Sequence, residues 1–269
     1  MYKYSQVKDA DIVIQQDIDK IIEAVKDKKL TAMYLFGSYG KGEGGFINNK
    51  AVNDYDILLI GGDKETEEEI NKVNVTTKIE LHKLDDVSNI QPTQQMFETI
   101  YGSKLLVGED VLKDITMEDY DIPFSDAITS LDKRVLSMLI GKYEMMKDEP
   151  DYNKVVNQIG KMIIAIGDAM LIKRGQFNPS YRTRMLMLLE DDIYQLYSIA
   201  VSHKLFGLPE LNPDEVWTLW NNVREYYRQY MIANQIKTDL SEILINYDDR
   251  IERDTLKGLL EALGVKSWL

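Results

Sequence analysis

The chain has 269 residues, a net charge of −13, two histidines and no cysteine, which excludes a disulfide framework, a thiolate zinc site and a cysteine nucleophile. Hydrophobic residues make up 44% of the sequence and charged residues 29%, which excludes a collagenous or wholly disordered chain. The acidic balance argues against a long nucleic acid as partner, because phosphate contacts need clustered Lys and Arg. Any metal must be held mostly by oxygen ligands.

Targeting and membrane-spanning segments are not expected. The first residues are polar rather than an apolar signal core, and the longest apolar run, 162–172, contains Gly167 and Asp168. That run is also shorter than the roughly 20 residues that span a bilayer. These features predict a cytoplasmic protein with no membrane partner, and they leave its oligomeric state open.

The first part of the chain alternates between helix-like and strand-like segments. Apolar residues at helical spacing predict helices, and short apolar runs that end at glycine predict buried strands. The expected order is helix 11–28, strand 31–36, strand 55–60, helix 63–73 and strand 75–81. Alternation along the last strand puts Glu80 and His82 on one face.

From Pro123 onward only helices are expected. Ser125 is a candidate N-cap for the first of them, and Asn212 followed by Pro213 marks a later helix start. The expected helices are 125–149, 152–174, 181–205, one from 213, and one or two more before Leu263. The predicted fold class is therefore α+β, with a small mixed-sheet domain over 1–122 and an all-helical domain over 123–269.

The most informative segment runs from Gly37-Ser38 to Asp54 and Asp56. A strand that ends in Gly-Ser presents free backbone N–H groups and a hydroxyl, which favours binding of a phosphate. The two aspartates are one residue apart at a strand entry, so both carboxylates point to the same face. Adjacent carboxylates repel each other unless a cation lies between them, which favours Mg²⁺. Glu80, on the neighbouring strand, can add a third carboxylate.

This order of hydrophobic strand, Gly-Ser, spacer, Asp-x-Asp and later acid resembles the polymerase-beta-like nucleotidyltransferase superfamily. The resemblance implies transfer of a nucleoside monophosphate from a nucleoside triphosphate, such as ATP, to a hydroxyl acceptor. It implies that Gly37 and Ser38 hold the triphosphate. It implies that Asp54, Asp56 and Glu80 bind two Mg²⁺ ions, for which Mn²⁺ can substitute, and that Glu80 deprotonates or orients the acceptor hydroxyl. The 15 residues between Ser38 and Asp54 form a longer spacer than compact members use, and 45–52 resembles a loop insertion.

The helical part offers further candidates for nucleotide binding. Lys161 lies on a polar stripe of an otherwise apolar helix, and the resemblance implies contact with the triphosphate. The alternative is a stripe that faces water or pairs internally. Tyr181 can stack on a base, and Arg182 or Arg184 can bind phosphate or the acceptor. The alternative there is a capped helix start with surface arginines.

Three other residues have simpler interpretations. Lys41 lies in a run, 40–45, that matches G-x-G-x-x-G, but no helical apolar period follows, so a dinucleotide site is rejected. Lys41 is expected as a solvated loop lysine in preference to a phosphate contact. His82 is expected as a polar strand residue, with a role beside Glu80 as the alternative. His203, in the last turn of a helix, is expected to be structural.

The sequence therefore predicts a metal-dependent nucleotidyltransferase that acts on a small-molecule acceptor. Two other functions stay open. One is a non-catalytic, nucleotide-binding regulatory module. The other is nucleotidylation of a protein, or synthesis of a signal nucleotide. Neither the acceptor nor the preferred base can be read from the residues.

Overall fold

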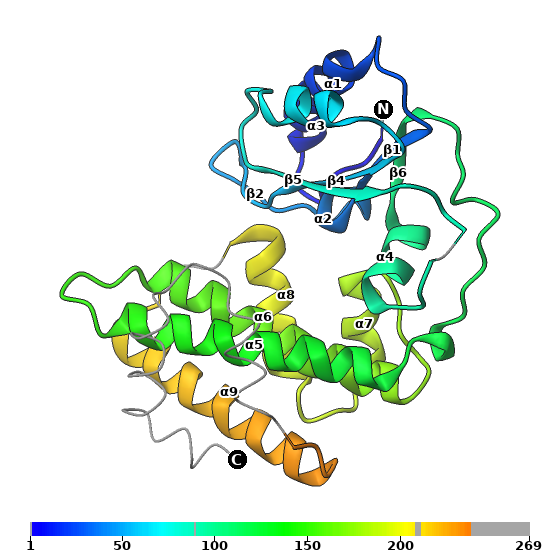
Figure 1. The fold of residues 1–269 in the computed structure, drawn as a ribbon. Helices are drawn as coiled ribbons and strands as arrows, with labels where there is room; N and C mark the ends of the chain where they lie inside the picture. The colour runs from blue at the N-terminus through cyan, green and yellow to red at the C-terminus, as the bar shows by residue number, and fades with distance from the viewer. Residues whose placement is uncertain (1, 89, 208–210, 238–269) are drawn as a thin grey trace. The chain divides into compact units, whose positions relative to one another are not determined.

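The computed structural model describes residues 2–88, 90–207 and 211–237, and these divide into two compact units. The first, which we call the sheet unit, comprises Met1–Pro123, Gly175–Leu186 and Lys204–Gly207. The remainder forms the helical unit. Figure 1 shows a small mixed sheet with helices around it and, separately, a set of long helices. The predicted α+β class is confirmed.

The sheet has four strands in the order β5-β4-β1-β6. β1 is Ala32–Phe36, β4 is Tyr55–Ile60, β5 is Ile79–Leu84 and β6 is Lys104–Gly108. β1 is antiparallel to both β4 and β6, whereas β4 and β5 are parallel. The sheet is therefore mixed, and the strands predicted at 31–36 and 55–60 are confirmed.

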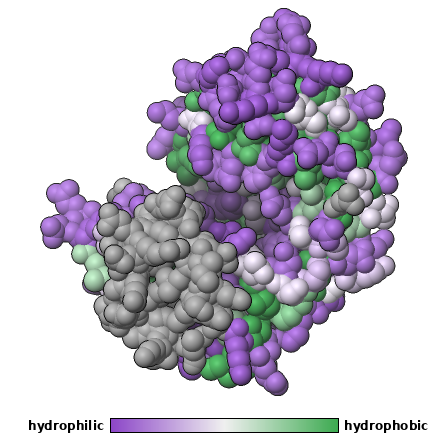
Figure 2. Space-filling view, in the orientation of Figure 1, coloured by the Kyte–Doolittle hydropathy of each residue, from purple (hydrophilic) through white to green (hydrophobic). Residues whose placement is uncertain are grey.

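Both faces of the sheet are covered. Helices α1 (Ala10–Val25) and α3 (Lys64–Asn71) lie over one face (Figure 1), where Met33 and Leu35 of β1 join their core. Tyr34 of the same strand packs with a second cluster on the opposite face. This is why β1 is buried along its whole length. The outward surfaces of α1 and α3 are mostly hydrophilic in Figure 2.

β5 begins later than the strand predicted at 75–81. The backbone N–H of Thr76 donates to the buried carboxylate of Asp17 on α1 at 2.9 Å, and the Thr76 hydroxyl bonds to the same oxygen. The chain is thus held against α1 before it joins the sheet. Glu80 and His82 nevertheless both lie on β5.

Short elements fill the connections within the sheet unit. Between β1 and β4 lie α2 (Gly37–Gly40) and a hairpin of β2 (Phe46–Ile47) and β3 (Lys50–Ala51). After β5 come α4 (Gln94–Gly102), β6 and the 3₁₀ helix η1 (Asp119–Asp121), none of which was predicted. Thr93 caps α4 by accepting the N–H of Met96 at 3.1 Å, a local signal that the sequence does contain.

The helical unit contains α5 (Phe124–Met145), α6 (Tyr152–Lys173), α9 (Pro213–Ala233) and most of α8 (Tyr194–Phe206). The predicted cap at Asn212 is confirmed, because its side chain and that of Glu215 bond to each other's backbone N–H groups. Buried Trp220 of α9 donates its indole N–H to the carbonyl of Met138 on α5 at 3.1 Å. Within the described residues, α6 is the one helix long and apolar enough to cross a membrane, and 72% of its most apolar window is buried in protein.

Two details of the helical prediction are wrong. α5 begins at Phe124, directly after Pro123, so Ser125 lies inside its first turn. The helix predicted at 181–205 is two helices, α7 (Tyr181–Met187) and α8. In the segment between these two helices, the carboxylate of Asp191 pairs with Arg174 at the end of α6.

The sheet unit also includes two segments, Gly175–Leu186 and Lys204–Gly207, from the range 123–269 that was predicted as the helical domain. Most of α7 and the last residues of α8 belong to the sheet unit. The one or two helices expected before Leu263 fall beyond position 237, outside the described residues.

Candidate active site

Gly37 begins α2 directly after β1, and its surroundings require glycine. Its φ is +63°, a conformation that side chains disfavour. A Cβ at Gly37 would lie 1.8 Å from Oδ2 of Asp56, so the Asp56 carboxylate fills the space beside the glycine. Ser38 follows within α2 and is buried. The Gly-Ser pair and the second aspartate are therefore brought together, as the sequence motif predicts.

The acidic residues meet because the strands align them. Asp56 is paired in register with Phe36 of β1 on one side and with Glu80 of β5 on the other. Tyr55, between the two aspartates, turns into the core, where its hydroxyl donates to Asp17 at 3.1 Å. Alternation then places Asp54 and Asp56 on the opposite side from Tyr55.

Asp56 carries the strongest electrostatic signal in this group. Its pKa is raised from 3.8 to about 7, chiefly by burial and then by the negative charges of Glu80 and Asp54. The ammonium groups of Lys204 and Lys41 act in the opposite direction but do not compensate. Burial and two neighbouring carboxylates thus both disfavour the ionised form of Asp56, and a divalent cation bound there would favour it.

The donor chemistry of the acidic group suits Mg²⁺ or Mn²⁺, since its carboxylates offer oxygen only. Across the described part of the chain, however, no three Asp, Glu or His side chains are gathered closely enough to form a ready metal site. Glu80 is half-exposed, its side chain 47% accessible, and its Oε1 lies 3.6 Å from Nε2 of His82. The His82 ring contacts Phe36 edge-on. Binding of a metal by Asp54, Asp56 and Glu80 accordingly stays a prediction.

The long spacer before Asp54 is an ordered hairpin rather than an open loop. Asn48 and Asn49 occupy its turn with φ of +50° and +60°. The buried hydroxyl of Tyr39 closes its base, donating to the carbonyl of Gly45 at 2.8 Å and accepting the N–H groups of Val52 and Asn53 at 3.1 and 3.3 Å. The insertion therefore leaves the entry to β4 firmly held.

Lys41 is not the solvated loop lysine that was expected. Its side chain is 3% exposed, and its Nζ lies 3.1 Å from the carboxylate of Glu98 on α4. Burial is the largest single influence and lowers the pKa of Lys41, but the charge of Glu98, the charge of Tyr181 and the hydrogen bond to Glu98 together outweigh it, so the pKa is raised. The nearby α4 was not predicted, so the sequence offered no partner that would bury this lysine.

α7 adds an aromatic ring and a buried arginine to the same cluster. The ring centroid of Tyr181 lies 3.9 Å from Nζ of Lys41, 4.4 Å from Cζ of Arg184 and 5.2 Å from Nζ of Lys204. Arg184 is fully buried and pairs with Glu98 at 2.9 Å, so it is no surface arginine. We call this group, comprising Lys41, Glu98, Tyr181, Arg184 and Lys204, the cation cluster.

The cation cluster lies within electrostatic reach of the acidic group, since Lys41 and Lys204 both act on the pKa of Asp56. Sequence reasoning missed Glu98 and Lys204. Neither residue belongs to a motif, and a lone lysine near a helix end carries no local signal. Arg182, by contrast, is exposed and donates to Gln6.

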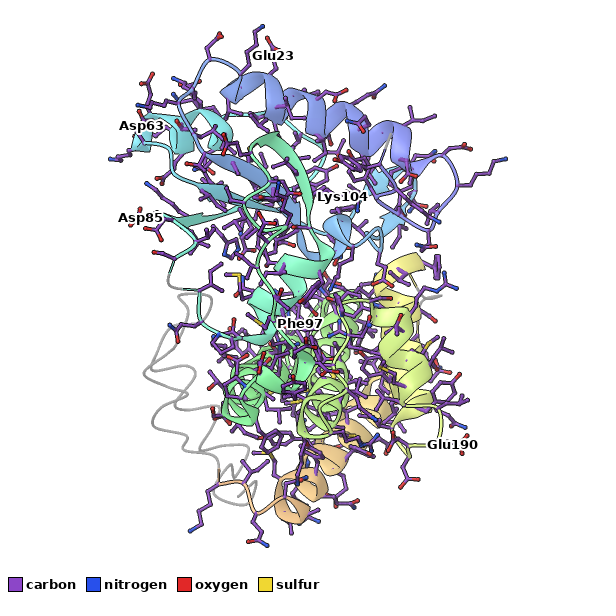
Figure 3. The ribbon with its side chains drawn as sticks, turned by 90° about the vertical axis from the view of Figure 1, so that its right-hand side faces the viewer. Glu23, Asp63, Asp85, Phe97, Lys104 and Glu190 are labelled. Carbon is purple, nitrogen blue, oxygen red and sulfur yellow. The ribbon has the colours of Figure 1, made fainter. Side chains whose placement is uncertain are left out.

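Lys104 supports α2 from β6, where Figure 3 labels it. Its ammonium donates to the carbonyls of Tyr39 and Gly40 at the end of that short helix. Burial lowers the pKa of Lys104 to about 8, and the charge of Asp11 opposes this only in part.

Two predicted residues lie outside this cluster. Lys161 belongs to α6 of the helical unit and is partly buried, whereas the other candidate site residues all belong to the sheet unit. Contact of Lys161 with a nucleotide stays a prediction. His203, on α8, has its pKa lowered by burial, in keeping with a structural role.

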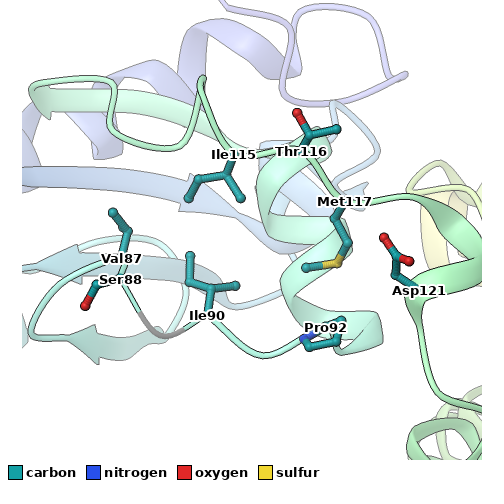
Figure 4. A pocket seen from close by; sticks show the side chains of 8 residues that line it. All are labelled: Val87, Ser88, Ile90, Pro92, Ile115, Thr116, Met117 and Asp121. Carbon is teal, nitrogen blue, oxygen red and sulfur yellow. The ribbon is translucent and has the colours of Figure 1, made fainter.

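The sheet unit also has a pocket of about 380 Å³ away from the motif residues. Figure 4 shows its two walls, which come from the chain after β5 and the chain before η1. Ile90 and Pro92 line one side, and Ile115 and Met117 the other. None of the predicted site residues lines it.

Comparison with known proteins leaves the family of this chain undetermined. No protein-family model matches the chain, and no curated protein matches it. One similar solved structure is a spectinomycin adenyltransferase, AAD(9), from Enterococcus faecialis with ATP and spectinomycin. The identity is 16% and the TM-score 0.40, with 80% of this chain and 98% of that chain covered. A similarity of this strength says nothing about the activity of this chain.

Proposed function

We propose that this protein is a metal-dependent nucleotidyltransferase that transfers a nucleoside monophosphate from a nucleoside triphosphate to a hydroxyl on a small molecule. The observation that carries the proposal is the placement of Asp56. This buried carboxylate lies against Gly37, in register with Glu80, and its pKa is raised to about 7. An ionised carboxylate that is buried beside two other carboxylates lowers the stability of the fold unless a cation binds to it, so such a group is typical of a functional site.

In the proposed site, Asp54, Asp56 and Glu80 would hold two Mg²⁺ ions, for which Mn²⁺ can substitute. When bound, the metal supplies charge neutralisation for the phosphates and the attacking oxygen. Glu80 accepts the proton of the acceptor hydroxyl, whose oxygen forms a bond to the α-phosphorus. The bond from the α-phosphorus to the bridging oxygen breaks, and pyrophosphate leaves toward Gly37 and Ser38. Most of the catalysis is positioning and electrostatic stabilisation.

The cation cluster supports a refined role for Tyr181. Three cationic side chains lie close to its ring. We therefore assign Lys204, which is partly exposed, to the triphosphate and Tyr181 to holding it, in place of stacking on a base; Lys41, buried against Glu98, supports the ring. Lys161 is kept as a proposed nucleotide contact from the helical unit.

The acceptor is proposed as a small molecule because the chain is acidic overall and a long nucleic acid would be repelled. A cationic compound would suit such a surface. Transfer to a protein and synthesis of a signal nucleotide use the same chemistry, and they differ from transfer to a small molecule only in the acceptor. We also propose a cytoplasmic location without a membrane partner; the support is the polar start of the sequence and the short length of its longest apolar run.

The test is calorimetric titration of each of the four nucleoside triphosphates, with and without Mg²⁺, into wild type and the Asp54→Asn/Asp56→Asn double variant. Binding that needs Mg²⁺ and is lost in the double variant is the expected result. Pyrophosphate release in an acceptor screen then separates an enzyme from a non-catalytic binding module, which would hold the triphosphate unchanged. Equal Mg²⁺-dependent binding by both proteins would refute the metal assignment.

A further inference from the structure

Glu43 is a buried carboxylate that joins the loop after α2 to the start of α7. It is 3% exposed. Its Oε1 accepts the hydroxyl of Ser180 at 2.7 Å and the N–H of Arg182 at 3.2 Å, while Oε2 accepts the N–H of Tyr181 at 2.8 Å. These three bonds go to consecutive residues that lie more than 130 positions away in the chain. The carboxylate therefore holds one short stretch of backbone.

Glu43 is itself held in place. Its backbone N–H donates to the carbonyl of Ser38 at 2.9 Å, and the next residue, Gly44, donates to Tyr4 at 2.9 Å and accepts the hydroxyl of Ser5 at 2.7 Å. The carboxylate thus extends from backbone that is fixed to α2. Hydrogen bonds to an ionised acceptor are roughly twice as strong as those between neutral groups.

The backbone that Glu43 holds carries the ring of the cation cluster. Tyr181 lies with its ring centroid 3.9 Å from Nζ of Lys41 and 5.2 Å from Nζ of Lys204. Lys41 is only two residues before Glu43 in the same loop. One loop therefore supplies both a cation for the ring and the carboxylate that fixes the backbone of that ring.

We propose that Glu43 is a positioning residue of the nucleotide site: by fixing the backbone of Tyr181, it keeps the tyrosine ring against Lys41 and Lys204 and so sets where the Lys204 ammonium group meets the phosphates. The choice of ligand rests on the proposed function, but the positioning of the ring does not. Glu43 acts through Tyr181 and touches no reacting atom.

The first readout is the titration of Tyr181, followed by NMR of protein labelled with ¹³C at tyrosine Cζ, with Tyr181→Phe to identify its resonance. Burial alone raises the pKa of Tyr181, but the charges of Lys204 and Lys41 outweigh it, and the pKa is lowered. Glu98 and Arg184 are the other charged groups that act on this ring. In Glu43→Gln, one of the two carboxylate oxygens becomes an NH2 group, which cannot accept the hydrogen bonds that Ser180, Tyr181 and Arg182 donate. The backbone of Tyr181 is then held less firmly, the tyrosine ring moves away from the lysines, and the pKa of Tyr181 rises.

The second readout is nucleotide affinity. Glu43→Gln is expected to weaken Mg²⁺-dependent binding of the preferred triphosphate roughly tenfold. KM for the triphosphate should rise more than kcat falls. Glu144→Gln is the matched control, because Glu144 is equally buried, at 4% exposed, and pairs with Lys147 and Lys154 in the helical unit. It should cost stability yet leave the Tyr181 titration and the affinity unchanged.

Each outcome decides the proposal. An upward shift of the Tyr181 titration with weaker binding in Glu43→Gln, but not in Glu144→Gln, supports it. A folded Glu43→Gln variant with wild-type titration and affinity overturns it. If Glu43→Gln does not fold, Ser180→Ala, which removes one of the three donors, must show the same shifts in smaller measure. If wild type binds no triphosphate, the proposed function fails, and the Tyr181 titration alone still decides whether Glu43 positions the ring.

Discussion

Replacing Asp56 by Asn is expected to stabilise the metal-free protein while it removes Mg²⁺-dependent nucleotide binding. The pKa of Asp56 is raised from 3.8 in a free side chain to about 7 in the fold. Each pKa unit is worth about 1.36 kcal/mol, so keeping this carboxylate ionised costs at most about 4 kcal/mol of folding free energy. Asparagine has nearly the same shape and carries no charge.

The sign of this effect follows from proton binding. Between pH 3.8 and about 7 the folded protein holds a proton on Asp56 that the unfolded chain releases. The stabilisation from that proton is complete below pH 3.8 and is lost as the pH rises through 7. Asp56→Asn should therefore match wild type near pH 4 and exceed it in stability at pH 8.

Hydrogen exchange of the β1 and β4 amides, measured without divalent cation at pH 5 to 8, reports the stability of the sheet unit directly. The free energy of opening should fall with pH in wild type and stay flat in Asp56→Asn, after correction for intrinsic exchange. Asp27→Asn, which changes an exposed carboxylate, should follow wild type. Adding Mg²⁺ at pH 8 should stabilise wild type but not Asp56→Asn. If Asp56→Asn is no more stable than wild type at pH 8, the charge of Asp56 is compensated and the reasoning fails.

Three further substitutions test the packing around the site. Gly37→Ala should lower the thermal midpoint by several degrees, because a Cβ would meet the Asp56 carboxylate at 1.8 Å. The control is Gly160→Ala, whose Cβ would lie 3.9 Å from its nearest neighbour and which should be neutral or stabilising. Equal thermal midpoints for the two variants would contradict this prediction. Glu98→Gln should cost about 3–5 kcal/mol in urea unfolding, since it leaves two buried cations without their carboxylate; a loss below about 1 kcal/mol would show that the pairs are solvated. Tyr39→Phe should speed hydrogen exchange in the hairpin at 45–53 and leave α6 unchanged, and unaltered exchange there would mean that its hydroxyl does not close the hairpin.

Local patterns in the sequence were enough to place the acidic group. Gly37, Asp54 and Asp56 are close together in sequence, and strand alternation alone puts the two aspartates on one face. To place Glu80, the prediction also had to assume that its strand pairs with β4. The register of the two strands in the structure puts Glu80 opposite Asp56. Short-range periodicity carries this information because β1 is buried along its whole length and β4 along nearly all of its length.

The cation cluster could not be predicted in this way. Lys41 and Glu98 are separated by 57 positions, and Glu43 and Tyr181 by 138. No periodicity links such residues. A lysine in a glycine-rich loop is solvated by default, and it is buried here because α4 and α7 bring a carboxylate and an aromatic ring to it.

Composition, turn residues and hydrophobic spacing thus determine the class of fold, the strands of the motif and its carboxylates, because these depend on neighbours within a few residues. The return of α7 to the sheet unit, and with it the burial of Lys41 and Arg184, is decided only in the tertiary structure. The physical reason is that a buried cation is stable only where a carboxylate from another segment meets it. That meeting depends on how the whole chain packs.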